Sequence, residues 1–397
     1  MKKLKIGYLI KYFYPIQGGA ENYMLNLALL TVKDGHEVHV FTSDRKGKDK
    51  GLKFEENYKG IQIHRCRLLF DFTHYFFLSP SLMSKLLKQE LDILHVSGFG
   101  FVWHDFILII KRIKSRKTEF INTPHGPFMA LSSYILPLRL IKFIYTNIQK
   151  LFLNWLYDII LEDNTFQWRW IVKYRIDKEK IKLVTPGLDS EVISKQIDDH
   201  DLREFTQKYF LKDKFIISCL GRISKYKGIQ DVIEIMPDLV KFKSNIAYLV
   251  MGRDDGYART LKMLAEKGGV KNNIRFIIDI SEKEKILALE SSQIFIFPSE
   301  WEAFGIVILE AMCRGNAIIS TKTEGGKYLV TEGMNGFLYN SGDNKELYSY
   351  IVKLIKDKML LGRMQKENKL RVRRFSWEGI YKEKYTPIIY SHYLKKV

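Results

Sequence analysis

Two hydrophobic patterns alternate along the chain, and they predict different elements. Short continuous runs rich in β-branched and aromatic residues predict buried strands, whereas longer stretches with apolar residues every three or four positions predict helices. In the first half of the chain these patterns predict a helix at about residues 20–33 and strands at residues 4–10, 37–42, 61–66, 93–96 and 119–123. Strands that alternate with helices are typical of a parallel sheet.

The alternation starts again after the polar stretch at residues 198–201, which we interpret as a linker. Beyond it, the patterns predict a helix at residues 228–240 and strands at residues 215–220, 247–251, 274–278 and 294–297. A chain of 397 residues is also longer than one hydrophobic core usually supports. We therefore expect an α/β protein with two doubly wound parallel-sheet domains of the Rossmann-like kind, the second beginning near residue 190.

The end of the chain carries a third pattern. Residues 376–397 are rich in aromatic side chains, and the segment is too long to be a frayed end. We expect it to form a helix that packs back on the two domains, which are then residues 1–190 and 191–375. Ligands of open parallel sheets bind beyond the carboxyl ends of the strands. Two such sheets facing each other across a cleft would bring the residues that follow each strand into one site.

The segment at residues 136–161 is the most apolar part of the chain, but charged residues interrupt it. It therefore falls short of the roughly 18 to 20 apolar residues that a membrane-spanning helix needs. Its polar residues recur at three- and four-residue steps, which predicts an amphipathic helix. Such a helix either faces a protein core or lies on an anionic membrane surface. We favour the membrane because Arg139, Lys142 and Lys150 and the basic cluster at residues 111–117 supply positive charge.

The overall charge narrows the choice of partners. Lys and Arg number 64 against 45 Asp and Glu, which gives a formal net charge of +19. This excess predicts an anionic partner: a nucleotide, a phospholipid surface or a nucleic acid. The three cysteines lie far apart and form no C-x-x-C pair, so we expect neither a disulfide framework nor a cysteine zinc site. Because the N-terminus shows no apolar signal stretch, the pattern favours a reduced, cytoplasmic protein.

Glycines and charged residues at the predicted strand ends are the candidate binding residues. Gly18 and Gly19 precede the first helix, where they either allow a tight turn or bring backbone amides to a phosphate. Arg222 and Lys227 share one strand-to-helix turn, and they either bind a diphosphate or face only solvent. His125 follows a predicted strand, and taken alone this position is more typical of a structural histidine.

The strongest signal lies at residues 298–312, directly after a predicted strand. Glu302 precedes a predicted helix, where it either meets a ligand or interacts with the helix dipole. Gly305 would let a ligand approach the N-terminus of that helix. Glu310 lies among apolar residues inside the helix, and a buried carboxylate needs a partner. That partner is either a pair of ligand hydroxyls, such as those of a ribose, or solvent at one polar edge of the helix.

Glu302 and Glu310 are separated by seven residues and enclose Phe304-Gly305. This arrangement resembles the E-x7-E motif of retaining GT-B glycosyltransferases of family 4, the group 1 glycosyltransferases. Further motifs in the family's order cover nearly the whole chain. They are Gly18-Gly19-Ala20-Glu21, Gly35-His36-Glu37-Val38, Thr123-Pro124-His125-Gly126, Gly221-Arg222, Lys227-Gly228, Glu324-Gly325-Gly326 and Asn335-Gly336.

The resemblance implies the GT-B fold and transfer of a hexose from a nucleotide-diphosphate sugar, with retention of the anomeric configuration. It also implies that Gly18 and Gly19 approach the donor diphosphate or the acceptor, and that Arg222 and Lys227 bind the diphosphate. His125 would touch the transferred sugar. Because such enzymes have no obvious protein nucleophile, stabilising the departing diphosphate would carry most of the catalysis.

The E-x7-E segment would supply the remaining donor contacts. The resemblance implies that Glu302 contacts sugar hydroxyls and that Glu310 binds the ribose. The backbone amides near Phe304, Gly305 and Ile306 would meet sugar and phosphate. We expect no cofactor, since the donor, linked to UDP or GDP, is a substrate. The acceptor would be a glycan or a lipid-linked molecule at the inner face of the cell membrane.

Several features keep other interpretations open. Residues 185–187 and 279–281 depart from the family's pattern, so the nucleotide base is undecided. Asp199-His200-Asp201 fits the D-x-D signature of metal-dependent glycosyltransferases, but it lies in the predicted linker, and we expect no metal site. The alternatives are another GT-B enzyme, such as a nucleotide-sugar epimerase or a phosphorylase, and a basic nucleic-acid-binding protein. No recognisable nucleic-acid-binding module occurs in the sequence, so we expect no nucleic acid partner.

Overall fold

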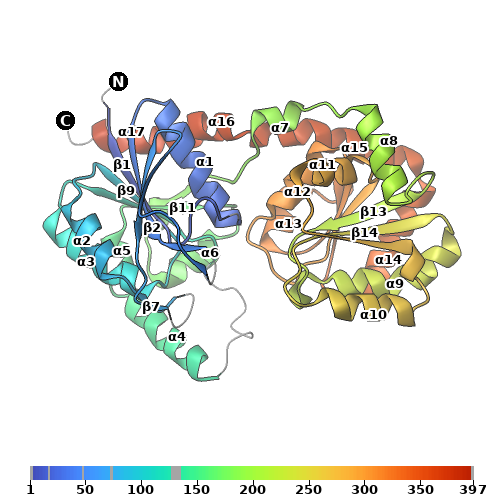
Figure 1. Ribbon diagram of the computed structural model, residues 1–397, viewed down its shortest axis with the longest axis horizontal. Helices are drawn as coiled ribbons and strands as arrows, with labels where there is room; N and C mark the ends of the chain where they lie inside the picture. The colour runs from blue at the N-terminus through green and yellow to red at the C-terminus, as the bar shows by residue number, and fades with distance from the viewer. Residues whose placement is uncertain (1–2, 17, 47–48, 72–74, 127–135, 395–397) are drawn as a thin grey trace. The chain divides into compact units, whose positions relative to one another are not determined.

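The computed structural model describes residues 3–16, 18–46, 49–71, 75–126 and 136–394. Contacts within the chain divide it into two compact units (Figure 1). Unit 1 comprises Met1–Pro186 and Trp377–Val397, and unit 2 comprises Gly187–Ser376. Each unit is built on a sheet of mainly parallel strands covered by helices. The predicted α/β class with two Rossmann-like domains is therefore confirmed.

Unit 1 has an eight-stranded sheet in the order β12-β11-β10-β9-β1-β2-β6-β5. Only β5 runs antiparallel to its neighbour in this sheet. The strands are β1 (Lys5–Leu9), β2 (Glu37–Ser43), β5 (Glu55–Tyr58), β6 (Ile61–Cys66), β9 (Ile93–Ser97), β10 (Glu119–Thr123), β11 (Ile159–Glu162) and β12 (Ile181–Leu183). Central strand β1 is buried on both faces, which explains its continuous apolar run.

Up to Pro186, unit 1 also contains helices and two short hairpins. The helices are α1 (Gly19–Lys33), α2 (Pro80–Lys88), α3 (Val102–Lys114), α4 (Leu136–Gln149), α5 (Leu153–Leu156) and α6 (Trp168–Ile171), followed by the 3₁₀ turns η2 (Val172–Tyr174) and η3 (Lys178–Lys180). The hairpins pair β3 (Arg45–Lys46) with β4 (Asp49–Lys50), and β7 (Phe70–Asp71) with β8 (Phe77–Leu78).

The prediction of one helix across residues 136–161 is wrong. Helix α4 ends at Gln149, the short helix α5 follows, and β11 then enters the sheet between β10 and β12. Ile160 and Leu161 in β11 are fully buried. A short apolar run of this kind looks the same in sequence whether it continues a helix or forms a buried strand, because both bury every side chain.

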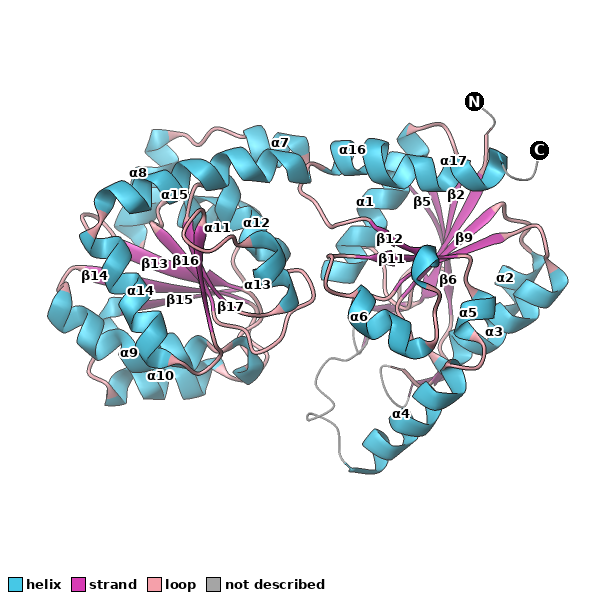
Figure 2. Ribbon diagram, turned by 180° about the vertical axis from the view of Figure 1, so that it is seen from behind, coloured by secondary structure: helices cyan, strands magenta, loops and turns pink. Residues whose placement is uncertain are grey.

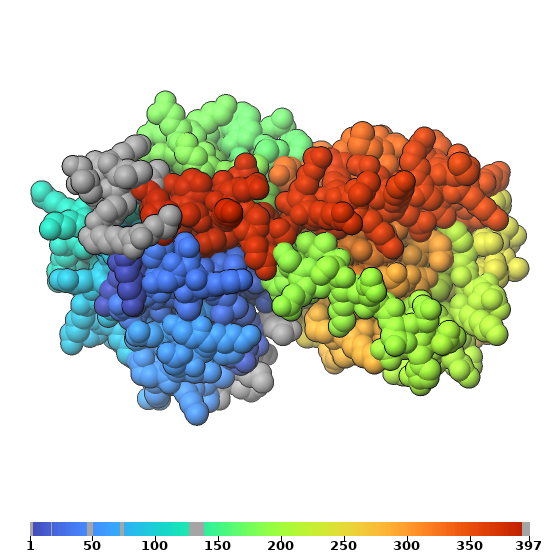
Figure 3. Space-filling model, turned by 90° about the horizontal axis from the view of Figure 1, so that it is seen from above, coloured from blue at the N-terminus to red at the C-terminus, as the bar shows by residue number. Residues whose placement is uncertain are grey.

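The C-terminal segment belongs to unit 1. It forms α16 (Trp377–Ile380), the π-helical turn η7 (Tyr381–Tyr385) and α17 (Thr386–Leu394), and Figure 3 shows it, in red, lying beside the N-terminal part of the chain. Trp377 and Tyr385 are buried in the same core as Tyr8 and Tyr23. The Tyr385 hydroxyl lies 3.2 Å from that of Tyr8, which anchors the segment on the central strand.

Unit 2 has a six-stranded, fully parallel sheet in the order β15-β14-β13-β16-β17-β18. Its strands are β13 (Phe215–Leu220), β14 (Ile246–Gly252), β15 (Ile274–Ile278), β16 (Ile294–Phe297), β17 (Ala317–Thr321) and β18 (Gly336–Tyr339). Alternate residues of β16 face opposite cores, with Ile294 and Ile296 in one and Phe295 and Phe297 in the other. Helices therefore cover both faces of the sheet (Figure 2).

Helices α9, α10 and α14 pack on one face of this sheet, and α8, α11 and α12 pack on the other. The helices of unit 2 are α7 (Ser190–Ser194), α8 (Asp199–Lys208), α9 (Ile229–Phe242), α10 (Ala258–Lys267), α11 (Glu282–Glu290), α12 (Ile306–Cys313), α13 (Glu324–Leu329), α14 (Asn344–Lys356) and α15 (Lys358–Arg371). The 3₁₀ turns are η4 (Lys225–Lys227), η5 (Lys271–Asn273) and η6 (Val372–Phe375).

The polar stretch at residues 198–201 is not a linker, as the sequence suggested, but the start of α8. Asp198 caps this helix, because its carboxylate accepts the backbone N–H of His200 at 2.6 Å. A cap of this kind satisfies one of the N–H groups that a helix N-terminus leaves unpaired. Phe205, further along α8, is buried against the sheet.

Candidate active site

A glycine brings together the loops that follow β13 and β16 in unit 2. Gly228 has a φ of +66°, and a Cβ added to it would lie 2.0 Å from the carbonyl oxygen of Pro298. A side chain at this position would push the two loops apart. The backbone N–H of Glu300 also donates to the carbonyl oxygen of Tyr226 at 2.9 Å. This close approach places a cation of one loop beside a carboxylate of the other.

Lys227 and Glu302 are that pair. The Nζ atom of Lys227 lies 2.6 Å from Oε2 of Glu302, and the two side chains are 14% and 24% exposed. The ammonium also lies 5.1 Å from the ring centroid of Tyr226 and 5.6 Å from that of Phe297. Aromatic rings attract a cation without neutralising it. The structure thus joins two residues, 75 positions apart, that the sequence analysis selected separately.

Arg222 lies on the same turn as Lys227 but is more exposed. Its guanidinium donates to the hydroxyl of Tyr226 at 2.6 Å and to Oδ2 of Asp255 at 3.4 Å. The sequence analysis missed both of these partners. Asp255 follows β14, whose end is joined to the Arg222 loop by a hydrogen bond from Ile223 N to Arg253 O. Asp255 is a carboxylate just after a predicted strand, and this position could have marked it as a candidate.

The loop from Glu302 to Gly305 leads into the N-terminus of α12. Gly305 is the N-cap, with a φ of +82°, a backbone conformation that suits glycine. The side chain of Phe304 is buried in the core, so only its backbone faces the site. A Cβ at Gly325 would lie 2.1 Å from the carbonyl oxygen of Phe304, which explains the glycine there. Ile306 begins α12, so the predicted backbone contacts lie at the positive end of a helix.

Glu310 has a protein partner that the sequence analysis did not foresee. Its Oε1 atom lies 2.6 Å from Nζ of Lys285, and the side chains are 17% and 16% exposed. Burial raises the pKa of Glu310, and the attraction of Lys285 only partly offsets that rise. For Lys285, burial lowers the pKa, but the charges of Glu310 and Glu282 outweigh it and the net direction is upward. The carboxylate is held in place and keeps one oxygen for another partner.

The two glycines of unit 1 lie at the start of α1. Gly18 is the N-cap in an extended conformation, and Gly19 is the first helical residue. Among the described residues, no atom other than those of the chain neighbours and the backbone of α1 lies within 4 Å of the place where a Cβ of Gly19 would be. An anionic group that approached this helix N-terminus would meet the positive end of the helix.

His125 follows β10 and has a positive φ of 52°. Its Nδ1 atom lies 3.3 Å from Oδ2 of Asp163, and its ring meets the ring of Tyr23 edge-on at 5.0 Å. Its Nε2 atom is buried and has no hydrogen-bond partner among the residues that the structure describes. The sequence analysis missed Asp163 because the strand before it, β11, was interpreted as helix.

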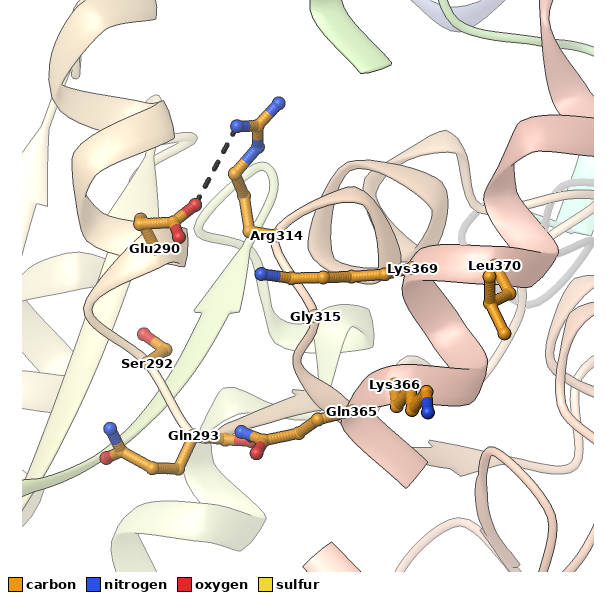
Figure 4. A pocket seen from close by; sticks show the side chains of 9 residues that line it. All are labelled: Glu290, Ser292, Gln293, Arg314, Gly315, Gln365, Lys366, Lys369 and Leu370. Carbon is orange, nitrogen blue, oxygen red and sulfur yellow. Dashed lines mark hydrogen bonds and ion pairs between the residues drawn. The ribbon is translucent and has the colours of Figure 1, made fainter. Parts of the chain in front are cut away.

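A cavity of about 400 Å³ lies elsewhere in unit 2 (Figure 4). Its walls come from the end of α11, from α15 and from the segments that precede β16 and β17. It therefore opens at the amino ends of those strands, on the opposite edge of the sheet from Lys227 and Glu302. Arg314 and Glu290 pair across its wall at 3.7 Å. None of the predicted site residues lines this cavity.

Within the described part of the chain, His200, Asp201 and Glu204 are the group with ligand atoms close enough to share a metal ion. All three lie on α8, and Asp201 already pairs with Lys283 at 2.8 Å. Exposed acidic groups are common without a metal, and this one lies away from the strand ends. We therefore assign no metal site to it, and metal-independent activity stays a prediction.

Two Rossmann-like units, one of which gathers cations and carboxylates at its strand ends, are typical of the GT-B glycosyltransferases. The family model described as glycosyl transferases group 1 matches residues 201–371, and that of glycosyltransferase family 4 matches residues 17–192. The chain belongs to this family. It is a glycosyltransferase that uses a nucleotide-sugar donor.

Relatives and solved structures agree with this assignment. The chain is 25% identical over 372 residues to N-acetyl-alpha-D-glucosaminyl L-malate synthase of Bacillus anthracis, covering 90% of this chain and 89% of that one. It is 23% identical over 326 residues to the GPI3 subunit of phosphatidylinositol N-acetylglucosaminyltransferase of Saccharomyces cerevisiae, covering 81% and 68%. The structure of HepE from Anabaena in complex with UDP and glucose superposes with a TM-score of 0.76 at 18% identity, covering 99% and 100%.

Proposed function

We propose that the protein is a retaining, metal-independent hexosyltransferase that transfers a sugar from a UDP- or GDP-linked donor to a glycan or lipid-linked acceptor at the cytoplasmic face of a membrane. The observation that carries this proposal is the Lys227–Glu302 pair, 2.6 Å apart. One member is a cation suited to the donor diphosphate, and the other is a carboxylate suited to the sugar hydroxyls. HepE of Anabaena was solved with UDP and glucose, which supports a uridine-linked donor.

In this proposal Lys227 and Arg222 stabilise the negative charge that develops on the departing diphosphate. The Lys227 ammonium is already positioned by Glu302 and two aromatic rings, so little reorganisation is needed when charge develops. The N-terminus of α12 adds backbone donors, and Glu310 accepts from the ribose. Lys227, Arg222 and the helix N-terminus supply the positive charge that a divalent ion supplies in metal-dependent transferases, which is why we propose that no metal ion is needed.

One assay tests the reaction itself. The protein is incubated with α-linked UDP- and GDP-hexoses, with and without polyprenyl-phosphate or glycan acceptors, in excess EDTA. We expect acceptor-dependent release of the nucleoside diphosphate and an α-linked product, identified by NMR of the anomeric proton. A β-linked product, or activity that EDTA abolishes and Mn²⁺ or Mg²⁺ restores, would contradict the proposal. Sugar isomerised without an acceptor would indicate an epimerase, and glycan cleaved by inorganic phosphate would indicate a phosphorylase.

We also propose an anionic membrane surface as a partner of unit 1. An apolar face runs along α4, the turn after it and the short helix α5. Its members, between 44% and 74% exposed, are Leu140, Ile141, Phe143, Ile144, Ile148, Leu151 and Trp155. The other side of α4 carries the contacts to the rest of unit 1, such as the hydrogen bond from Tyr145 to Asp105. Large apolar side chains exposed side by side on one helix face favour an interaction surface.

Charge favours lipid as the occupant of this face. Arg139 on α4 is exposed, and the chain as a whole carries a net charge of +19. Each basic residue near an anionic leaflet adds about 1 kcal/mol. The relative from yeast is named for phosphatidylinositol, a lipid acceptor, which supports this partner. No described helix is long and apolar enough to cross a membrane.

The membrane proposal predicts that the triple variant Phe143→Ser, Leu151→Ser, Trp155→Ser loses most of its vesicle binding. Burying each side chain contributes about 1.5 kcal/mol, so the loss of all three should lower the partition coefficient about a thousandfold. Sedimentation with phosphatidylglycerol-containing vesicles at low salt measures it. Met359→Ser with Leu370→Ser, which changes exposed apolar residues of unit 2, is the matched control and should bind like wild type. Equal binding by the triple variant, or no binding by wild type, would refute the proposal.

A further inference from the structure

The ring of His125 is held by contacts from two separate segments of unit 1. Asp163 comes from the end of β11, and Tyr23 comes from α1. Tyr23 is itself held, because its hydroxyl donates to the carbonyl oxygen of Val184 at 3.0 Å and its ring meets that of Trp377 at 5.4 Å. The imidazole therefore has little freedom to rotate.

Asp163 is a buried carboxylate with a defined orientation. Its side chain is 3% exposed, and Oδ2 lies 3.3 Å from Nδ1 of His125. Its backbone N–H donates to Oε1 of Gln167 at 2.9 Å, and the Gln167 side chain is fully buried. A residue whose backbone is fixed in this way presents its carboxylate at one place. Burying a carboxylate costs free energy, so a buried and fixed carboxylate such as that of Asp163 indicates a role beyond packing.

The contact determines where the proton of His125 lies. An ionised carboxylate can only accept hydrogen bonds, so the atom facing it, Nδ1, has to carry the proton. In the neutral ring the other nitrogen, Nε2, is then a bare acceptor. This Nε2 atom is buried without a partner among the described residues. A hydroxyl can donate a hydrogen bond to a bare imidazole nitrogen, and a sugar carries several hydroxyls.

We infer that Asp163 is a positioning residue that holds His125 in the Nδ1–H tautomer, so that Nε2 accepts a hydrogen bond from a sugar hydroxyl. The second half of this inference rests on the proposed function, in which His125 contacts the transferred sugar. The first half concerns the protein alone and is tested without any substrate.

Nitrogen-15 NMR of the full chain, labelled at its nine histidines, reads the tautomer directly. The His125 signals are assigned by their loss in His125→Gln. We expect wild type at pH 7.5 to show a protonated Nδ1 and an unprotonated Nε2. In Asp163→Asn the side-chain amide can donate to Nδ1, so the proton should move to Nε2. Asp177→Asn is the control, since Asp177 is an exposed partner of Asn154 and should leave the His125 signals unchanged.

Wild type with a protonated Nε2, or an Asp163→Asn spectrum like that of wild type, would overturn the inference. Where sugar transfer is measurable, Asp163→Asn should lower kcat/KM about tenfold to a hundredfold, the effect of losing a hydrogen bond made by a charged group. Its affinity for the nucleoside diphosphate alone should not change, because Asp163 acts on His125, which is proposed to contact the sugar and not the nucleotide. If the tautomer is as expected but no donor supports transfer, the proposed function fails and the positioning role stands.

Discussion

Lys227→Ala is expected to lower turnover about a thousandfold, the upper range found when one preorganised group that stabilises developing charge is removed. The ammonium lies 2.6 Å from Glu302 and beside two aromatic rings, so it is placed before the donor arrives. Folding should suffer far less, by about 1 kcal/mol, because ion pairs close to solvent contribute little to stability. Steady-state kinetics and thermal unfolding of the same samples separate the two effects.

Lys225→Ala is the matched control for this experiment. Lys225 lies on the same 3₁₀ turn, η4, and is exposed, and the sequence analysis gave it no role. It should keep the turnover of wild type. Arg222→Ala should also lower turnover, and the double variant with Lys227→Ala should lose less than the product of the single losses, since both cations act on one leaving group. Wild-type turnover in Lys227→Ala, or an equal loss in Lys225→Ala, would remove Lys227 from the proposed chemistry.

Strand periodicity made most of the fold predictable from sequence. The apolar runs at β1, β2, β6, β9 and β10 of unit 1 and at β13, β14, β15 and β16 of unit 2 are short, rich in β-branched residues and bounded by polar segments, and the structure places strands there. Strands β17 and β18 of unit 2 were not predicted. The same rule failed at β11. The run Ile159–Glu162 follows an amphipathic segment without a turn signal, so its local pattern is compatible with both elements. The segment forms a strand because it pairs with β10 in the sheet, a contact that its local sequence does not show.

In the candidate site, several residues could be selected from the local sequence, but their contacts with residues distant in sequence could not be predicted. Glu302 and Lys227 could be selected from sequence because each lies in a loop that follows a predicted strand and precedes a predicted helix. Their pairing was not predictable, since it depends on the contact between Gly228 and Pro298 across two loops. Lys285 was missed because it stands in a run of alternating charges, Glu282-Lys283-Glu284-Lys285, that is typical of a solvated helix. Only the packing of α11 against α12 shows that one of these lysines meets Glu310.

Glu310→Gln is expected to weaken binding of the donor nucleotide about tenfold to a hundredfold, since the carboxylate is proposed to accept from ribose hydroxyls and such bonds contribute about 1.5 to 3 kcal/mol. Isothermal calorimetry with UDP and GDP measures the loss. Glu282→Gln is the matched control, because Glu282 pairs with the same lysine at 2.7 Å but is 75% exposed. It should bind the nucleotide like wild type. Unchanged affinity in Glu310→Gln would place the ribose elsewhere.

The pH dependence of donor binding is a second, independent test of the role of Glu310. Burial raises the pKa of Glu310, so its carboxylate takes up a proton at a higher pH than an ordinary glutamate does. Donor affinity should therefore fall as the pH falls through this raised pKa, and Glu310→Gln should remove this pH dependence of donor affinity.

The stability of the folded protein responds to Glu310 in the opposite direction. A carboxyl group whose pKa is higher in the folded than in the unfolded protein contributes stability below the unfolded pKa, and that contribution is lost as the pH rises through the folded value. Acid should thus weaken binding in wild type while Glu310 itself makes the fold more stable, and a loss of affinity that merely follows unfolding would contradict the assignment.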